Sequence, residues 1–233
     1  MRGLQLERFL SEQRRLSALA LIPFINAGDP SLALSRELLR ALAASGVRVV
    51  ELCLAFPNSP TDGSVMRASH ARSLASDVTW PSFLSLVREA TVQLDLFCVV
   101  LVDYAYSVAP RGMDEVIADV EHAGAAAMLV HGLPGRERAR YLERSRAAGL
   151  GRIMSCFATS EPQVRRAAFD ESLGYTYVVS SFGRTGGSVA CSDELQQRLQ
   201  RIRAETSRPL AVGFGLQRAQ DVALVRSTGM DAA

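Results

Sequence analysis

The feature that most constrains the fold is a regular alternation of short apolar runs with longer stretches whose apolar residues recur at helical spacing. Successive runs begin roughly 23 to 34 residues apart, except for one interval of about 49, which is the spacing of βα units. The predicted strands are Leu21–Asn26, Val47–Leu54, Leu96–Asp103, Ala126–Val130, Arg152–Ala158, Tyr175–Ser180 and Pro209–Phe214. The predicted helices are Leu4–Gln13, Ser31–Ala44, Pro81–Gln93, Met113–Ala123, Arg136–Ala148, Glu161–Ser172, Ser192–Thr206 and Gln217–Thr228.

Seven βα units in a row, preceded by a helix, favour a closed (β/α)₈ TIM barrel over an open sheet. A dinucleotide-binding sheet is disfavoured because no G-x-G-x-x-G follows the first strand. With 233 residues and 48% apolar content, residues 1–233 suffice for a single domain with one large core. The closing letters STGMDAA indicate the end of the last helix and the approach to an eighth strand. The sequence stops before an eighth strand could follow, so we expect the eighth βα unit to be absent from this chain. A barrel without its last strand would expose two strand edges, so we expect the carboxyl-terminal end of the barrel domain to be incomplete here.

Composition excludes several classes of chemistry. The 26 cationic side chains are all arginine, so the chain cannot form a lysine Schiff base, hold pyridoxal phosphate through lysine or supply a P-loop lysine. A net charge of +2 without runs of like charge indicates neither a nucleic acid nor a membrane as partner. We therefore expect a cytoplasmic protein that acts on a small molecule.

Cysteine and histidine show no pattern typical of a metal site. The four cysteines are far apart, without a C-x-x-C pair, and three lie in apolar runs, so we expect reduced, buried thiols. The histidines His70, His122 and His131 lack ligand spacing, which predicts no metal site and disfavours a metal-dependent aldolase.

Two carboxylates stand out around the second predicted strand. Glu51 interrupts the apolar run VRVVELCLAF, and Asp62 follows eleven residues later in the loop of the long interval. Alone, each has an ordinary interpretation, Glu51 as a structural ion-pair partner and Asp62 as a turn residue before glycine. Together, beside the pocket at the carboxyl ends of barrel strands, they can divide acid and base roles.

Glycine clusters and aromatic residues follow other predicted strands. The segments SSFGRTGGS (Ser180–Ser188) and AVGFGL (Ala211–Leu216) lie in neighbouring units, where backbone N–H groups can hold a phosphate. Four aromatic residues lie on or just after strands, where they are either ordinary core or the walls of a flat apolar ligand's pocket: Phe24, Tyr104, Tyr177 and Phe214.

These segments together resemble the α subunit of tryptophan synthase. The matching stretches are LIPFINAGDPS, VVELCLAFPNSPTDG, GYTYVVSSFGRTGG and AVGFG, which occur in the family's order and cover essentially the whole chain. The resemblance implies a (β/α)₈ barrel that cleaves indole-3-glycerol phosphate to indole and glyceraldehyde 3-phosphate, in tryptophan biosynthesis, without metal or organic cofactor.

The resemblance also implies roles for individual residues. Glu51 matches the family's general acid/base, and Asp62 matches the carboxylate that stabilises positive charge on the indole ring. The remaining matches concern substrate binding: Thr185 as the loop residue that meets the catalytic aspartate, Gly186 and Gly215 as phosphate-contacting backbone, and Phe24, Tyr104, Tyr177 and Phe214 as the indole-side pocket.

Departures from the family concentrate in three loops that meet the β subunit in family members. The family's ELGIPFSDPLADG reads ELCLAFPNSPTDG here, Tyr106 stands where the family has asparagine, and Gly132 replaces a carboxylate. We therefore expect a stand-alone lyase that releases indole and doubt a β-subunit partner. The alternatives are the α subunit of a working synthase and a catalytically idle barrel that binds an indole-like or phosphorylated ligand.

Overall fold

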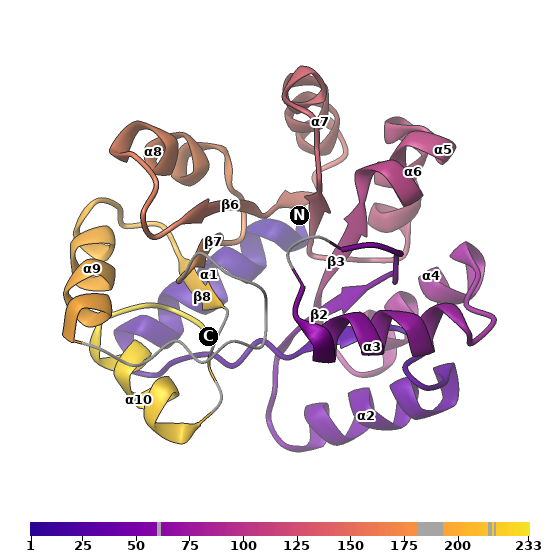
Figure 1. The fold of residues 1–233 in the computed structure, drawn as a ribbon, viewed down its shortest axis with the longest axis horizontal. Helices are drawn as coiled ribbons and strands as arrows, with labels where there is room; N and C mark the ends of the chain where they lie inside the picture. Colours follow the sequence, from indigo (N-terminus) through magenta and orange to yellow (C-terminus); the bar gives the residue numbers. More distant parts are fainter. Residues whose placement is uncertain (60–61, 181–192, 214–215, 217) are drawn as a thin grey trace.

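The structure, a computed structural model, describes residues 1–59, 62–180, 193–213, 216 and 218–233, and arranges helices around a ring of parallel strands (Figure 1). The strands are β1 (Phe24–Asn26), β2 (Val49–Cys53), β3 (Phe97–Asp103), β4 (Ala127–His131), β5 (Gly151–Arg152), β6 (Met154–Phe157), β7 (Thr176–Val179) and β8 (Leu210–Gly213). The α-helices are α1 (Arg2–Arg15), α2 (Leu32–Ala44), α3 (Ser64–Leu74), α4 (Trp80–Arg88), α5 (Ala109–Arg111), α6 (Met113–His122), α7 (Gly135–Ala147), α8 (Pro162–Glu171), α9 (Asp193–Ala204) and α10 (Ala219–Ser227). Two π-helical turns, η1 (Glu89–Gln93) and η2 (Tyr104–Val108), follow α4 and β3.

Strand order follows the sequence throughout. Strands β1 to β5 pair side by side, as do β6 to β8, and every pair is parallel. The single strand predicted over Arg152–Ala158 is divided at Ile153 into β5 and β6, because Arg152 also bridges to Leu173 in the antiparallel sense. This strand therefore links the two groups of strands into one barrel wall.

The expectation that nothing of the eighth strand is present needs correction. Asp231–Ala233 lies between β8 and the residues before β1, since Ala232 bridges both Ala211 and Ala20 in the parallel sense. The backbone N–H of Ile22 donates to the carbonyl of Ala233 at 2.8 Å, and that of Val212 donates to Ala232 at 3.0 Å. Three residues are too few to show a periodic pattern, which is why sequence reasoning overlooked them.

Side chains alternate between the barrel interior and the surrounding helices. Val49, Val99, Ala127 and Ala211 belong to an interior cluster, whereas the residues between them on the strands pack outward against the helices. Helix α1 contributes Leu6 and Leu10 to the same interior cluster, and Figure 1 shows it crossing behind the strands. The barrel is thus filled at its amino-terminal end and leaves its carboxyl-terminal end for a site.

Helix α3 is the main element that the sequence did not predict. Its buried face is polar, with His70 and Ser73 as its buried residues, so it lacks the apolar stripe by which helices are recognised. Hydrogen bonds hold it instead, because Ser73 Oγ donates to the carbonyl of Ala27 at 2.6 Å and Asn26 Nδ2 donates to Ser69 Oγ at 2.9 Å. Among the described helices, none is long and apolar enough to cross a membrane.

We predict that Asp231→Ala destabilises the barrel by about 3–5 kcal/mol. The Asp231 side chain is fully buried, lies 2.6 Å from Arg203 Nη1 and accepts the N–H of Leu210 at 2.9 Å, so its removal leaves a buried guanidinium without its partner. Urea unfolding measures the effect. Glu194→Ala, which removes an exposed pair with Arg198 on α9, serves as control and should cost less than about 1 kcal/mol; equal losses would contradict the prediction.

Candidate active site

Glu51 lies at an inward-facing position of β2, between Phe24 of β1 and Val99 of β3. It is only 5% exposed, and alternation along the strand directs it into the barrel in the same way as Val49, which belongs to the interior cluster. A carboxyl at such a position must be neutral or strongly hydrogen-bonded, because an ionised carboxylate loses its hydration there.

The hydroxyl of Tyr175 donates a hydrogen bond to Glu51 Oε1. Burial raises the pKa of Glu51 to about 7, although the Tyr175 hydrogen bond acts in the opposite direction. Near neutral pH the carboxyl can therefore both give and take a proton. Sequence analysis missed Tyr175, but it lies two residues before Tyr177 in the predicted strand Tyr175–Ser180, so the two side chains share a face; this was the available signal.

Asp62 is held by a histidine from the unpredicted helix. His70 Nε2 lies 3.1 Å from Asp62 Oδ2, and His70 Nδ1 accepts the backbone N–H of Phe56 at 3.2 Å. Because Nδ1 acts as acceptor, the ring proton of the neutral imidazole is on Nε2, and Nε2–H donates to the aspartate. His70 is buried, so the tautomer and the orientation of Asp62 are fixed together. The short separation of eight residues between Asp62 and His70 was the available sequence signal.

Glu51 and Asp62 lie near the same side chains in the barrel interior. The charges of Asp62 and Glu51, with that of Asp103, add to burial in raising the pKa of the Cys53 thiol well above its ordinary value. Burial and the charges of Glu51 and Asp62 likewise raise the pKa of Tyr177. Since charge effects of this kind fall off with distance, both carboxylates lie near the Cys53 and Tyr177 side chains.

The other predicted site residues divide into three groups. Phe24 and Tyr177 line the interior beside Glu51, and the Tyr177 hydroxyl lies where a Cβ on Gly213 would be, so only glycine fits there. Tyr104 instead packs against the cluster between sheet and helices, because η2 begins at this residue. Thr185, Gly186, Phe214 and Gly215 lie outside the described residues.

A second aspartate–histidine pair lies at the ends of β3 and β4. Asp103 and His131 are opposite one another in register, and His131 Nδ1 is 2.8 Å from Asp103 Oδ2. The ring of Phe56 stacks on His131 with centroids 5.2 Å apart and contacts His70 at 4.7 Å. Sequence analysis did not single out Asp103; its position as the last residue of a predicted strand was the available signal.

The cysteines that the structure describes lie in the core of the protein. Cys53, Cys98 and Cys156 are free and buried, as predicted, and Cys191 lies outside the described residues. In the ranges that the structure describes, no group of three His, Cys, Asp or Glu side chains could hold a metal ion.

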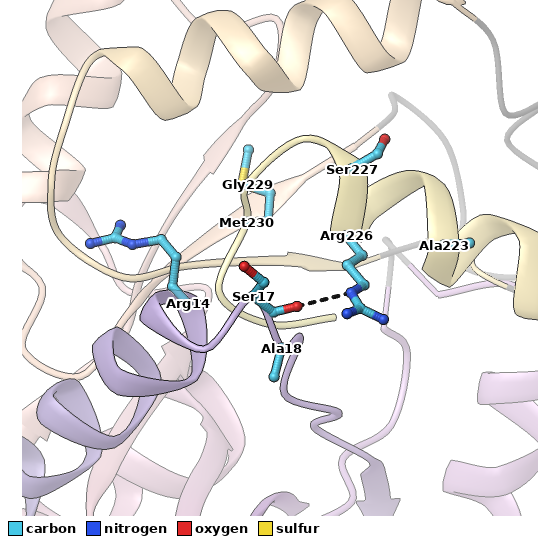
Figure 2. A pocket seen from close by; sticks show the side chains of 8 residues that line it. All are labelled: Arg14, Ser17, Ala18, Ala223, Arg226, Ser227, Gly229 and Met230. Atoms are coloured by element: carbon cyan, nitrogen blue, oxygen red, sulfur yellow. Dashed lines mark hydrogen bonds between the residues drawn. The ribbon is translucent and has the colours of Figure 1, made fainter.

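A cavity of about 380 Å³ lies elsewhere, between the end of α1 and α10. Figure 2 shows its lining residues, with Arg226 Nε donating to the carbonyl of Ser17 at 3.0 Å. None of the predicted site residues lines it. Met230, which does line it, comes just before the short eighth strand, so the cavity lies at the amino-terminal end of the barrel. Substrates of barrel enzymes bind at the opposite end, so this cavity is not the candidate site.

The structure is a parallel barrel with a buried carboxyl, Glu51, on β2 and a second carboxylate, Asp62, on the loop that follows that strand, which is the arrangement of a barrel enzyme. Residues 10–233 match the family model "Tryptophan synthase alpha chain". The chain belongs to this tryptophan synthase alpha chain family, as the sequence resemblance predicted.

Individual relatives agree with this assignment. The chain is 34% identical over 215 residues to the tryptophan synthase alpha chain of Prochlorococcus marinus strain MIT 9313, covering 92% of this chain and 78% of the relative. It is 35% identical over 201 residues to the tryptophan synthase alpha chain of Azoarcus sp. strain BH72, covering 86% of this chain and 74% of the relative. Mycobacterium tuberculosis tryptophan synthase superimposes with a TM-score of 0.86 at 24% identity, covering 98% and 86%. A mutant tryptophan synthase alpha-subunit from Pyrococcus furiosus superimposes with a TM-score of 0.83 at 23% identity, covering 91% of this chain and 85% of that one. These two structures show that the fold is shared.

We predict that Glu51→Gln changes the pH dependence of stability. The folded pKa of about 7 exceeds the ordinary value of 4.5, so between these values the folded chain holds a proton that the unfolded chain has lost. Wild-type stability therefore falls as pH rises through this window, and glutamine removes the effect. The unfolding free energy of the variant relative to wild type should rise by about 2–3 kcal/mol from pH 5 to pH 8.

Urea unfolding at the two pH values measures this difference. Glu121→Gln, at an exposed position on α6, should show no such trend. A Glu51→Gln curve parallel to that of wild type at both pH values would contradict the raised pKa.

Proposed function

We propose that this chain cleaves indole-3-glycerol phosphate into indole and glyceraldehyde 3-phosphate. The observation that carries the proposal is the buried carboxyl of Glu51, which burial holds at a pKa of about 7 in a space shared with Asp62. Retro-aldol cleavage needs one group that first donates and then accepts a proton, and a pKa near the working pH serves both steps. Family membership supplies the substrate class.

The residues account for each proton in the reaction. Neutral Glu51 donates its proton to the indole ring carbon that carries the side chain, and the resulting positive charge extends to the ring nitrogen. Asp62, oriented by His70, accepts a hydrogen bond from this more acidic ring N–H and stabilises the charge. The ionised Glu51 then takes the proton of the adjacent side-chain hydroxyl, the carbon–carbon bond breaks, and its electrons restore the aromatic ring while the aldehyde forms.

Tyr175 has a supporting part in this scheme. Its hydroxyl donates to Glu51, and such a hydrogen bond favours the ionised carboxylate. Burial alone would favour the uncharged form of Glu51 more strongly. The opposing effects of burial and Tyr175 bring the pKa of the carboxyl to about 7. Thr185, as the loop residue that meets Asp62, and Gly186 and Gly215, as phosphate-contacting backbone, are part of the proposal and lie outside the described residues.

We predict that Glu51→Gln lowers kcat for indole release by at least about 10²–10⁴, because glutamine cannot transfer the protons. Asp62→Asn should also lower kcat, since an amide does not carry the charge that stabilises the protonated ring. Indole is measured colorimetrically after mixing protein with substrate. Asp77→Asn, in the turn after α3, is a control expected to keep wild-type turnover. Wild-type turnover by Glu51→Gln would contradict the assignment.

The expected loss of the β subunit is not supported by the comparisons. A Pyrococcus furiosus structure with a TM-score of 0.83 to this chain is described as a tryptophan synthase a2b2 complex with mutual activation. We therefore infer that this chain acts as the alpha-type member of a complex and delivers indole to a β subunit. Release of free indole by the chain alone is the second candidate, favoured by Tyr106 and Gly132 in loops that meet the β subunit in the family.

Adding a tryptophan synthase β subunit should raise indole turnover by about tenfold, which corresponds to a coupling free energy of about 1.4 kcal/mol between the subunits. The expected effect arises because the partner would contact loops at the carboxyl-terminal end of the barrel, next to the proposed active site. The measurement compares kcat with and without the β subunit, with serum albumin as a protein control. An unchanged kcat, together with no co-elution on gel filtration, would favour the stand-alone lyase.

A further inference from the structure

The Asp103–His131 pair has no part in the proton transfers described above. Both residues occupy inward-facing positions at the last residues of their strands, in line with Val99 on β3 and Ala127 on β4, which belong to the interior cluster. Glu51 is level with Val99 in the register, so the pair lies four residues, or about 13 Å along a strand, nearer the mouth of the barrel. It therefore lies at the rim of the site, out of reach of the proton positions that Glu51 serves.

The pair is rigid and its hydrogen-bonding state is defined. Asp103 Oδ2 accepts from His131 Nδ1 at 2.8 Å, and Asp103 Oδ1 accepts the backbone N–H of Tyr106 at 3.0 Å. The carboxylate oxygen is the acceptor, so His131 Nδ1 carries a proton, and in the Nδ1–H tautomer of the ring Nε2 is an acceptor. Phe56 stacks on the imidazole and fixes its plane.

One hydrogen-bonding atom of this pair remains available to a ligand. Asp103 is 8% exposed and His131 is 27% exposed by side chain. For the residues that the structure describes, no hydrogen bond is made by His131 Nε2. Gly132, with φ of 65°, turns the chain immediately after His131, and a Cβ there would lie 3.5 Å from Asp103 Oδ2. The local backbone thus leaves space beside the pair.

The rim pair adjoins the same space as the catalytic carboxylates. The charge of Asp103 acts on the buried Cys53 thiol together with those of Asp62 and Glu51. Phe56 contacts His70, the partner of Asp62, and His131. A flat ring bound with its N–H at Asp62 would therefore lie beside the Phe56 ring, within the span between the two aspartate–histidine pairs.

The proposed reaction, on which this step rests, orients that ring. The side chain of the substrate extends from Glu51 toward its phosphate, which the glycine-rich segments after β7 and β8 are expected to hold. Counting β5 and β6 as the one strand that they form, β3 lies across the ring from β8, and β4 lies across from Asp231–Ala233, because strand order follows the sequence. The benzo edge of the indole, which carries neither the ring N–H nor the side chain, then faces the ends of β3 and β4.

We propose that His131 Nε2, oriented by Asp103, accepts a hydrogen bond from a hydroxyl or amino substituent on the benzo ring, so that the chain selects a ring-hydroxylated or aminated indole substrate. An unsubstituted ring edge would displace water from Nε2 without replacing its hydrogen bond, and sites built around a polar group discriminate against analogues that lack it. The selectivity resides in an acceptor at the rim and not in the carboxylates that perform the cleavage.

The condensation direction tests this directly, because indoles and glyceraldehyde 3-phosphate are available as reactants. In that direction the ring carbon bonds to the aldehyde carbon and loses its proton, and the aldehyde oxygen gains one. The assay compares kcat/KM for indole, for the four indoles hydroxylated at each benzo-ring carbon, and for the four matching fluoroindoles. At one position the hydroxyl should exceed fluorine by about tenfold, as expected for one partly exposed hydrogen bond.

Variants assign the preference to the pair. His131→Leu should reduce the hydroxyl-to-fluorine ratio to about one, whereas His131→Gln, which retains a side-chain acceptor, should restore part of it. His122→Leu, at the exposed end of α6, is the matched control and should keep the wild-type ratio. Cooperative thermal unfolding of each variant checks that it folds. No preference in the wild type, or a preference that survives in His131→Leu, would overturn the proposal.

A separate measurement distinguishes this proposal from the proposed function. Calorimetric binding of the same hydroxyindole and fluoroindole pairs, without aldehyde, reports the rim acceptor whether or not the protein turns over. Binding preference without any condensation would support the rim subsite and contradict the lyase activity. Condensation of indole with equal binding of both analogues would support the activity and overturn the subsite.

Discussion

Closure of parallel strands into a ring is the constraint on which the rest of this structure depends. Once the wall is continuous, every strand residue faces either the interior or the surrounding helices, and the two sets alternate strictly. The last three residues complete the wall, because Ala232 joins β8 to the residues before β1. Burial of Asp231 against Arg203 at the amino-terminal end fixes this segment in place. The interior environment of Glu51 is a consequence of that closure.

Chemistry at the carboxyl-terminal end follows from opposing effects on the same groups. Burial favours the neutral form of Glu51 while Tyr175 favours the ionised form, and the balance brings its pKa to about 7. Asp62 lies on a loop, where strand geometry does not position it, so a histidine on α3 performs that task. The polar face of α3 thus has a functional explanation as well as a structural one. The two aspartate–histidine pairs contact the same Phe56 ring, which thus lies between the Asp62–His70 and Asp103–His131 pairs.

The departures from the family have different meanings at different positions. Gly132, where the sequence resemblance led us to expect a carboxylate, adjoins Asp103, whose carboxylate comes from the neighbouring strand. Tyr106 is 47% exposed, which fits a surface that meets another protein as well as it fits a free surface. In the proposed function these positions concern the partner and the substrate, whereas Glu51 and Asp62 concern the reaction.

The sequence alone was enough to predict the class of fold and to single out Glu51 and Asp62 as candidate site residues. Periodicity over long segments and a charge within an apolar strand are local signals that can be read without a structure. Family membership followed from motifs that local reading could match. Only tertiary structure decided which groups meet: Tyr175 with Glu51, His70 with Asp62, and Asp103 with His131. These contacts join residues that are 8 to 124 positions apart. Helix α3, which carries His70, lacks the apolar stripe by which a helix can be predicted from sequence. Packing geometry, which no periodicity encodes, brought them together.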